Sequence, residues 1–134
     1  CTYYEKDKKI KKKNFTNLKN SFNYQEFILN SSINSSTMIL KREVLKGIKF
    51  KKLNLLEDYI FKCQILKKNY TANKISQVLA YYRVYEHNRS KNKLNNLLFL
   101  WKVNKKYNKL NFLENLKSVI SISYNSLKKY HWQK

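Results

Sequence analysis

Residues 53–70 read LNLLEDYIFKCQILKKNY and contain Glu57 and Asp58, the only two adjacent acids in the chain. Apolar residues follow Asp58 at the three- and four-residue spacing of one helix face. They are Tyr59, Cys63, Leu66 and Tyr70. Lys62, by contrast, falls largely on the other side of such a helix. The stretch therefore predicts an amphipathic helix that begins at the acid pair and packs its apolar face against a core.

On either side of this helix the chain alternates short strands with helices. It has one Gly and no Pro, so Asn marks most of the turns, because Asn tolerates left-handed backbone. The predicted elements are two strands around a turn at 6–8, a helix at 24–29, a strand at 35–40, a helical turn ended by Gly47, a strand at 77–85, and helices at 94–106 and 112–130. With 134 residues, 43% of them hydrophobic, the chain is long enough for one domain with a real core.

The position of Asp58 before an apolar run has two interpretations. One is structural, because an Asp at a helix N-cap accepts hydrogen bonds from free backbone N–H groups. The other is chemical, because a carboxylate at a helix N-terminus on the rim of a cleft can take a proton from a substrate hydroxyl. The helix dipole would lower the pKa of this carboxyl and the neighbouring Glu57 would raise it.

The balance of 29 Lys and Arg against 8 Asp and Glu gives a formal net charge of +21. An anionic partner would explain this charge, whether nucleic acid, a membrane surface or a phosphorylated substrate. So would compositional drift, because Lys is spread along every segment together with Asn and Ile. Only three Arg are present, whereas nucleic-acid surfaces favour Arg in a concentrated patch. We therefore expect no specific nucleic-acid partner.

The sequence also indicates the cellular compartment in which the protein is expected. No apolar run approaches the roughly 20 residues that span a bilayer. Cys1 and Cys63 have no metal-binding spacing, and Cys63 falls on the predicted apolar face as a small buried hydrophobe. We expect a cytoplasmic location, and the positive charge would favour a peripheral place at the inner face of the membrane.

Three segments occur in an order and spacing that resemble a known family. They are SSTMILKREVL at 35–45, EDYIFKCQILKK at 57–68 and LAYYRVYEHNRSKNK at 79–93. Together they resemble the C-terminal, acceptor-side half of a family 2 glycosyltransferase with the GT-A fold. The likeness is greatest to the bacterial enzymes that build capsule, exopolysaccharide and teichuronic-type polymers. The fold class that this resemblance implies is α/β, a partial GT-A domain of a few mixed strands with flanking helices and a helical tail.

The resemblance implies roles for the acid pair and for three further residues. The second acid of the family's acid pair is the catalytic base, which would be Asp58 here, with Glu57 beside it to orient the acceptor. Arg83 and Tyr82, in the segment LAYYRV, and Thr37, in the segment SSTM, are the expected substrate-binding residues. An Arg at this point could contact a diphosphate or pair with Glu57.

The implied substrates are a nucleotide-sugar donor and a glycan or lipid-linked acceptor. The family also uses a divalent metal, Mn or Mg, whose ligands we expect mostly outside this chain. No Asp-x-Asp motif is present, and Glu5-Lys6-Asp7 lies too close to Glu57 in sequence to replace it. His87, two residues beyond the position where many relatives have a His, is better interpreted as a loop residue than as a ligand.

We expect the acceptor-side half to occupy residues 1–93 and a basic, aromatic helical tail to occupy 94–134. The family's nucleotide-binding half is missing, so we expect this chain to be part of a longer enzyme and inactive alone. The alternative function is a non-catalytic basic module that binds nucleic acid or an anionic membrane. The tail's aromatic residues could pack on the domain, rest on an anionic membrane or stack on single-stranded nucleic acid. These residues are Phe99, Trp101, Tyr107, Phe112, Tyr124, Tyr130 and Trp132.

Overall fold

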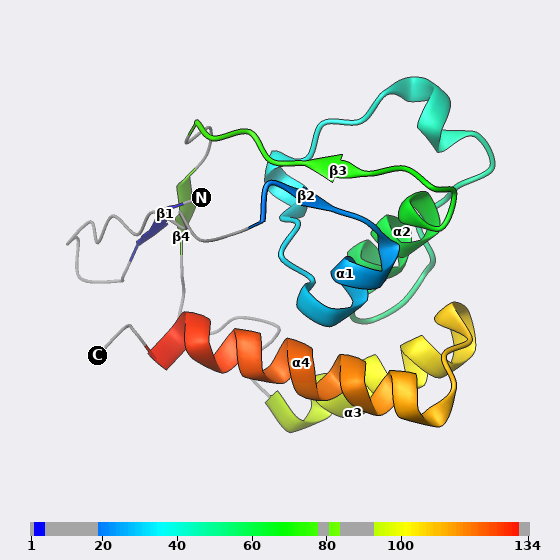
Figure 1. The fold of residues 1–134 in the computed structure, drawn as a ribbon, viewed down its shortest axis with the longest axis vertical. Coiled ribbons are helices and arrows are strands. Elements are labelled where there is room, and N and C mark those ends of the chain that lie inside the picture. The colour runs from blue at the N-terminus through cyan, green and yellow to red at the C-terminus, as the bar shows by residue number, and fades with distance from the viewer. Residues whose placement is uncertain (1, 5–18, 78–80, 84–92, 132–134) are drawn as a thin grey trace.

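The computed structural model describes residues 2–4, 19–77, 81–83 and 93–131. The helices α1 (Tyr24–Asn30) and α2 (Glu57–Leu66) lie beside each other, and α3 (Lys93–Val103) and α4 (Phe112–His131) form a second layer against them (Figure 1). The described residues also include three short helical segments: η1 (Ser35–Thr37) and η2 (Arg42–Leu45) are 3₁₀ turns, and η3 (Asn104–Asn108) is π-helical. The architecture is therefore mixed α and β, as predicted, with helix dominating the residues described.

The strands are short and form two separate pairs. β1 (Thr2–Tyr4) pairs in parallel with β4 (Tyr81–Arg83), and β2 (Ser21–Phe22) pairs antiparallel with β3 (Ala72–Asn73). β4 confirms part of the strand predicted at 77–85. The turn predicted at 6–8 lies outside the described residues. The described partner of β1 is β4, in which Tyr81 lies opposite Thr2.

The predicted helices at 24–29, 94–106 and 112–130 are confirmed to within a few residues. Two of them begin with an Asn cap. The side chain of Asn23 accepts the backbone N–H of Glu26 while Glu26 accepts the N–H of Asn23, and Asn111 and Glu114 make the same reciprocal pair. These capping boxes satisfy backbone donors that a helix start leaves free. In a chain with no Pro, Asn thus fixes where α1 and α4 start.

The strand predicted at 35–40 is wrong. The side chain of Asn34 accepts a hydrogen bond from the backbone N–H of Ser36 at 3.0 Å, and the chain turns into η1 instead of extending. Asn followed by Ser or Thr favours such turns, because these short polar side chains bond to nearby backbone. The helical turn ended by Gly47 is confirmed as η2, and Gly47 has the positive φ of 73° that glycine adopts without strain.

The central helix α2 is buried on more than the one face predicted. Tyr59, Ile60, Cys63 and Leu66 belong to a core cluster with α1 and α3. Phe61 and Ile65 point to a second cluster, with Val44 and Ile48 of the η2 region. A helix with apolar residues all round is a buried helix, so the prediction of an amphipathic one is wrong. Tyr70, assigned to its apolar face, lies beyond the end of α2 and is exposed.

A buried polar network joins α2 to the second layer. The side-chain oxygen of Asn104 accepts from the hydroxyl of Tyr59 at 3.0 Å and from the amide of Asn108 at 2.9 Å. The amide of Asn104 donates to Ser118 Oγ at 3.0 Å, and Ser118 Oγ donates to the carbonyl of Ile28 at 2.6 Å. The network connects α1, α2, η3 and α4 through side chains that are almost completely buried.

The tail helices therefore pack on the rest of the chain. Phe99 and Tyr107 lie against the core cluster, which confirms packing as the role of these two aromatic residues. Trp101 meets Phe112 edge to face, with ring centroids 5.5 Å apart, while Phe112 and Tyr124 are exposed. The side chains of Tyr130 and Trp132 lie outside those described. In the described part of the chain, no helix combines the length and apolar character needed to cross a membrane.

The network predicts that one buried hydroxyl contributes measurably to stability. Tyr59→Phe removes the donor to Asn104 without creating a large cavity, and we expect the free energy of unfolding to fall by about 1 kcal/mol. Tyr124→Phe, which removes the same hydroxyl from an exposed position, is the control and should change stability by less than about 0.5 kcal/mol. Urea unfolding followed by circular dichroism measures both. Equal effects of the two substitutions would contradict the network.

Candidate active site

Asp58 is the second residue of α2, not its cap. The N-cap is Leu56, whose backbone is left-handed (φ 61°, ψ 20°) and whose side chain caps nothing. The interpretation of Asp58 as the N-cap is therefore wrong. Both acids of the pair do lie in the first turn of α2, where the partial positive charge of the helix end favours carboxylates.

The carboxylate of Asp58 is held by two side chains. Its Oδ2 accepts a hydrogen bond from Lys62 Nζ at 2.8 Å and another from Ser35 Oγ at 2.7 Å. A third hydrogen bond to this carboxylate comes from the backbone N–H of Tyr59. Asp58 is therefore held in a fixed orientation by its neighbours, with its side chain 45% exposed.

Lys62 is the buried member of this pair. Its side chain is 5% exposed, whereas that of Asp58 is 45% exposed. Besides Asp58, the ammonium donates to the backbone carbonyl of Ile33 at 2.7 Å. The prediction that Lys62 lies on a polar outer face is wrong. Its side chain is buried, and the carbonyl of Ile33 and the carboxylate of Asp58 accept hydrogen bonds from its ammonium group.

Sequence reasoning missed both Ser35 and Lys62 as partners of Asp58. The spacing of Lys62, four residues after an acid on a helix, is a recognised signal for an ion pair. No local signal connects Ser35 to Asp58, because the two are 23 residues apart. Their contact depends on the 3₁₀ turn η1, which the prediction of a strand excluded.

The surroundings keep Asp58 ionised. Partial burial by itself would raise the pKa of this carboxyl. The charge of Lys62 and the hydrogen bonds from Lys62, Ser35 and the backbone N–H of Tyr59 act in the opposite direction and prevail, so the pKa lies below its ordinary value. Asp58 is therefore a carboxylate throughout the neutral pH range.

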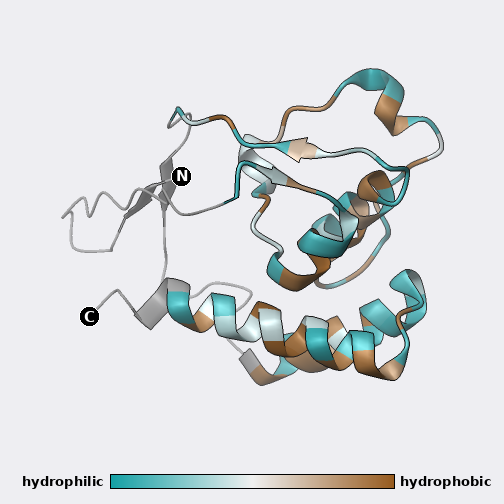
Figure 2. Ribbon diagram, in the orientation of Figure 1, coloured by the Kyte–Doolittle hydropathy of each residue, from teal (hydrophilic) through white to brown (hydrophobic). Residues whose placement is uncertain are grey.

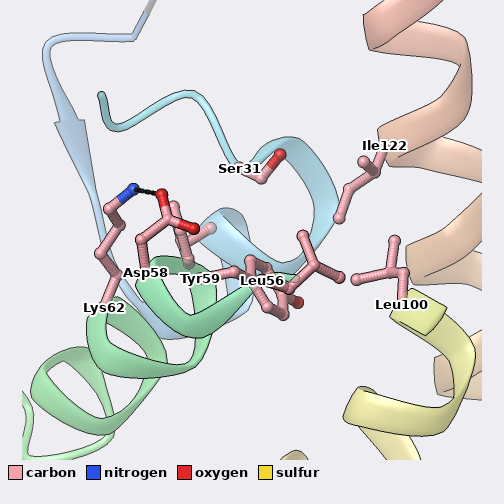
Figure 3. A pocket seen from close by; sticks show the side chains of 8 residues that line it. Ser31, Leu56, Asp58, Tyr59, Lys62, Leu100 and Ile122 are labelled. Carbon is pink, nitrogen blue, oxygen red and sulfur yellow. Dashed lines mark hydrogen bonds and ion pairs between the residues drawn. The ribbon is translucent and has the colours of Figure 1, made fainter. Parts of the chain in front are cut away.

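A pocket of about 130 Å³ opens beside Asp58 (Figure 3). Asp58 and Lys62 lie on one side of it, and Leu100 and Ile122 lie across from them on α3 and α4. The remaining wall is formed by Phe27, Ser31, Leu56 and Tyr59. The pocket therefore lies where the two helical layers meet, with an ionised acid at its polar end and apolar side chains at the other.

The other predicted site residues either do not line the pocket or have no described side chain. Glu57 is the first residue of α2 and is half-buried, but it does not line the pocket. Thr37 ends η1, with its hydroxyl 3.5 Å from the carbonyl of Asn34, and does not line the pocket either. Tyr82 and Arg83 lie in β4, where only the backbone is described. The structure thus brings Asp58 to the pocket, with Ser35 and Lys62, which were not predicted, as its partners.

The remaining candidates from the sequence are Cys63, His87 and the segment Glu5-Lys6-Asp7. Burial raises the pKa of the Cys63 thiol to about 11, and the thiol accepts a hydrogen bond from Asn108, so Cys63 is the buried small residue that was predicted. His87 and the segment Glu5-Lys6-Asp7 lie outside the described residues. Across residues 2–4, 19–77, 81–83 and 93–131, no three His, Cys, Asp or Glu side chains gather to form a metal site.

Comparisons with protein-family models, with curated proteins and with solved structures found no match to this chain.

The ion pair predicts a specific loss of stability in acid. Because the pKa of Asp58 is lower in the folded than in the unfolded chain, its ionised form stabilises the fold above the unfolded value of about 3.9. This contribution disappears as the pH falls through the lower folded pKa. Asp58→Asn should therefore reduce stability at neutral pH, and the difference from wild type should shrink toward pH 3.

Glu43→Gln is the matched control, because Glu43 is exposed and 4.0 Å from its nearest Lys. Urea unfolding at a series of pH values measures the difference. A gap between Asp58→Asn and wild type that is the same at every pH would contradict an ion pair at Asp58.

Proposed function

We propose that this chain is the acceptor-side part of an inverting family 2 glycosyltransferase of the GT-A fold, with Asp58 as its catalytic base. One observation carries the proposal: the acid that the sequence resemblance selects is an oriented, ionised carboxylate at a pocket. The proposed substrates are a nucleotide-sugar donor and a glycan or lipid-linked acceptor, in the synthesis of a bacterial surface polysaccharide.

In the proposed reaction Asp58 removes the proton from an acceptor hydroxyl. The oxygen then forms a bond to the anomeric carbon of the donor sugar, from the face opposite the bond to the nucleoside diphosphate, which breaks and leaves with its electron pair. Attack from the opposite face inverts the anomeric configuration. A carboxylate at this place needs only to be ionised and within hydrogen-bond reach of the hydroxyl.

The size of the pocket fits the acceptor end of such a reaction. Its volume is about 130 Å³. It is smaller than the pockets of about 300–1,000 Å³ that enclose whole ligands. The pocket would therefore admit the hydroxyl-bearing edge of an acceptor, while the nucleotide sugar would bind mainly to parts of the enzyme beyond this chain.

Ser35 and Lys62 are positioning residues in this proposal. Their hydrogen bonds to Oδ2 fix the orientation in which the carboxylate would meet the acceptor. The charge of Lys62 keeps Asp58 ionised by lowering its pKa. The same charge makes Asp58 a weaker proton acceptor. Proton transfer to Asp58 would therefore depend on the hydroxyl becoming more acidic as its oxygen bonds to the sugar.

The remaining assignments stay proposals based on the resemblance. Glu57 would support the acceptor loop from the start of α2. Arg83, Tyr82 and Thr37 would contact substrate, with Arg83 near the diphosphate. Manganese or magnesium would neutralise the diphosphate in the complete enzyme. The described residues of this chain do not gather into a set of metal ligands, so we derive no step through the metal.

The proposal predicts how substitutions at the acid pair separate rate from stability. In the full-length enzyme, Asp58→Asn should lower turnover by about 10²–10⁴-fold, the usual contribution of a general base. Glu57→Gln should lower turnover less, because its role is support. Transfer from a nucleotide sugar to the acceptor measures turnover, and the thermal midpoint of each variant shows whether the protein is folded.

Glu43→Gln, an exposed acid outside the site, should leave transfer unchanged. Near-normal transfer by a folded Asp58→Asn enzyme would contradict the assignment of the base. If the full-length protein transfers no sugar at all, the alternative is a non-catalytic basic module, for which Asp58 and Lys62 are only a structural ion pair.

A further inference from the structure

Helix α4 buries polar as well as apolar residues and exposes a further set of large apolar residues. The residues that it buries include Asn115 and Ser118, both almost completely inaccessible. Asn125, on the same side, donates to the carbonyl of Leu29 at 3.2 Å. Val119 and Ile122 of α4 pack against the core cluster. Six other large apolar residues of α4 are exposed, and they are Phe112, Leu113, Leu116, Ile120, Tyr124 and Leu127.

The exposed residues lie along one side of α4. The spacings of Leu113, Leu116, Ile120, Tyr124 and Leu127 are three or four residues, which places them in one stripe along the helix. α3 adds the exposed Leu94 and Leu98 to the same outer layer of the molecule. Figure 2 shows apolar positions along these two helices, which form the lower layer of the view. A contiguous apolar stripe on an outer helix indicates a surface that another body covers.

The charged residues around the stripe indicate which kind of partner covers it. Residues 93–131 contain eight Lys and one acid, Glu114. Lys117 and Lys128 lie four residues after Leu113 and Tyr124, so they flank the stripe along one edge. An apolar stripe bordered by lysines matches an anionic bilayer, in which acyl chains receive the apolar side chains and phosphate groups receive the ammonium groups.

Two other occupants fit less well. A second copy of this chain, docked stripe to stripe, would bring together two identical surfaces rich in lysine from chains of formal charge +21. Single-stranded nucleic acid would satisfy the lysines, but it stacks its bases on aromatic rings, and this stripe is mostly Leu and Ile. Of these three occupants, the bilayer is the one that satisfies both the apolar and the charged parts of the surface.

We propose that the outer face of α4 binds the surface of an anionic phospholipid bilayer, with its Leu, Ile and Tyr side chains inserted at the boundary of the headgroups. This function goes beyond sugar transfer and does not depend on it. Insertion would leave the buried polar side of α4 in its contacts with α1 and α3, so the fold would bind without rearranging.

Sedimentation of the 134-residue chain with lipid vesicles tests the proposal. The chain should bind vesicles that contain phosphatidylglycerol more tightly than vesicles of phosphatidylcholine alone, and added salt should weaken binding. Leu113→Gln with Ile120→Gln should reduce the affinity by about tenfold or more, because two large apolar side chains no longer leave water. Lys117→Gln with Lys128→Gln should reduce it by about thirtyfold, near one kcal/mol per lysine at an anionic surface.

The matched apolar control is Ile39→Gln with Ile75→Gln. These side chains are 77% and 52% exposed, against 74% and 59% for Leu113 and Ile120. The charge control is Lys51→Gln with Lys52→Gln, two exposed lysines in the loop before α2. Both controls should bind like wild type, and all variants should keep the thermal midpoint of wild type, since every substituted side chain is exposed.

Three results would overturn the proposal. The first is no preference of the wild-type chain for phosphatidylglycerol vesicles. The second is an equal loss of binding in the stripe variant and its apolar control. The third is a dimer, detected by light scattering and abolished by the stripe substitutions, which would make a second copy the occupant of the stripe.

Discussion

The carboxamide of Asn104 is the junction on which the arrangement of the helices depends. It contacts Tyr59 of α2, Asn108 of η3 and Ser118 of α4, and Ser118 passes the connection on to the backbone of α1. A fully buried amide is costly unless its bonding groups are satisfied, so only a helix packing that brings these partners together is acceptable. Apolar packing alone would permit α2 to slide or rotate against the second layer, whereas this network specifies one position.

The geometry of the candidate site depends on the position of α2 against the second layer. Asp58 precedes Tyr59 directly, so the hydrogen bond that fixes Tyr59 also fixes the start of α2. The pocket walls come from α1, α2, α3 and α4, so the pocket exists only when both layers are assembled. Its polar end is completed by the loop between α1 and η2, which supplies Ser35 to Asp58 and the Ile33 carbonyl to Lys62. The acid pair in the sequence therefore marks the place where the layers meet.

The sequence predicts those features that depend on local patterns. Helix spacing located α1, α3 and α4 and the start of α2, and Gly47 marked the end of a helical turn. Ser35 was misassigned because its β-branched neighbours favour a strand, whereas the side chain of Asn34 stabilises a turn. Lys62 was placed outside because its charge favours water, but the Ile33 carbonyl and Asp58 compensate it inside. The turn at Ser35 depends on the neighbouring Asn34, a local signal that competes with the strand pattern. The Ile33 carbonyl that accepts from Lys62 lies 29 residues away, which a local pattern cannot specify.

The central claim is that Asp58, which lines the pocket, is kept ionised with Lys62 as its buried partner. Carbon-13 NMR titration of the side-chain carboxyls measures this directly, and with only 8 Asp and Glu the signals are few enough to assign. The account predicts that Asp58 titrates below the ordinary value of about 3.9, and that its pKa rises in Lys62→Met. An ordinary pKa for Asp58, unchanged by Lys62→Met, would contradict the account.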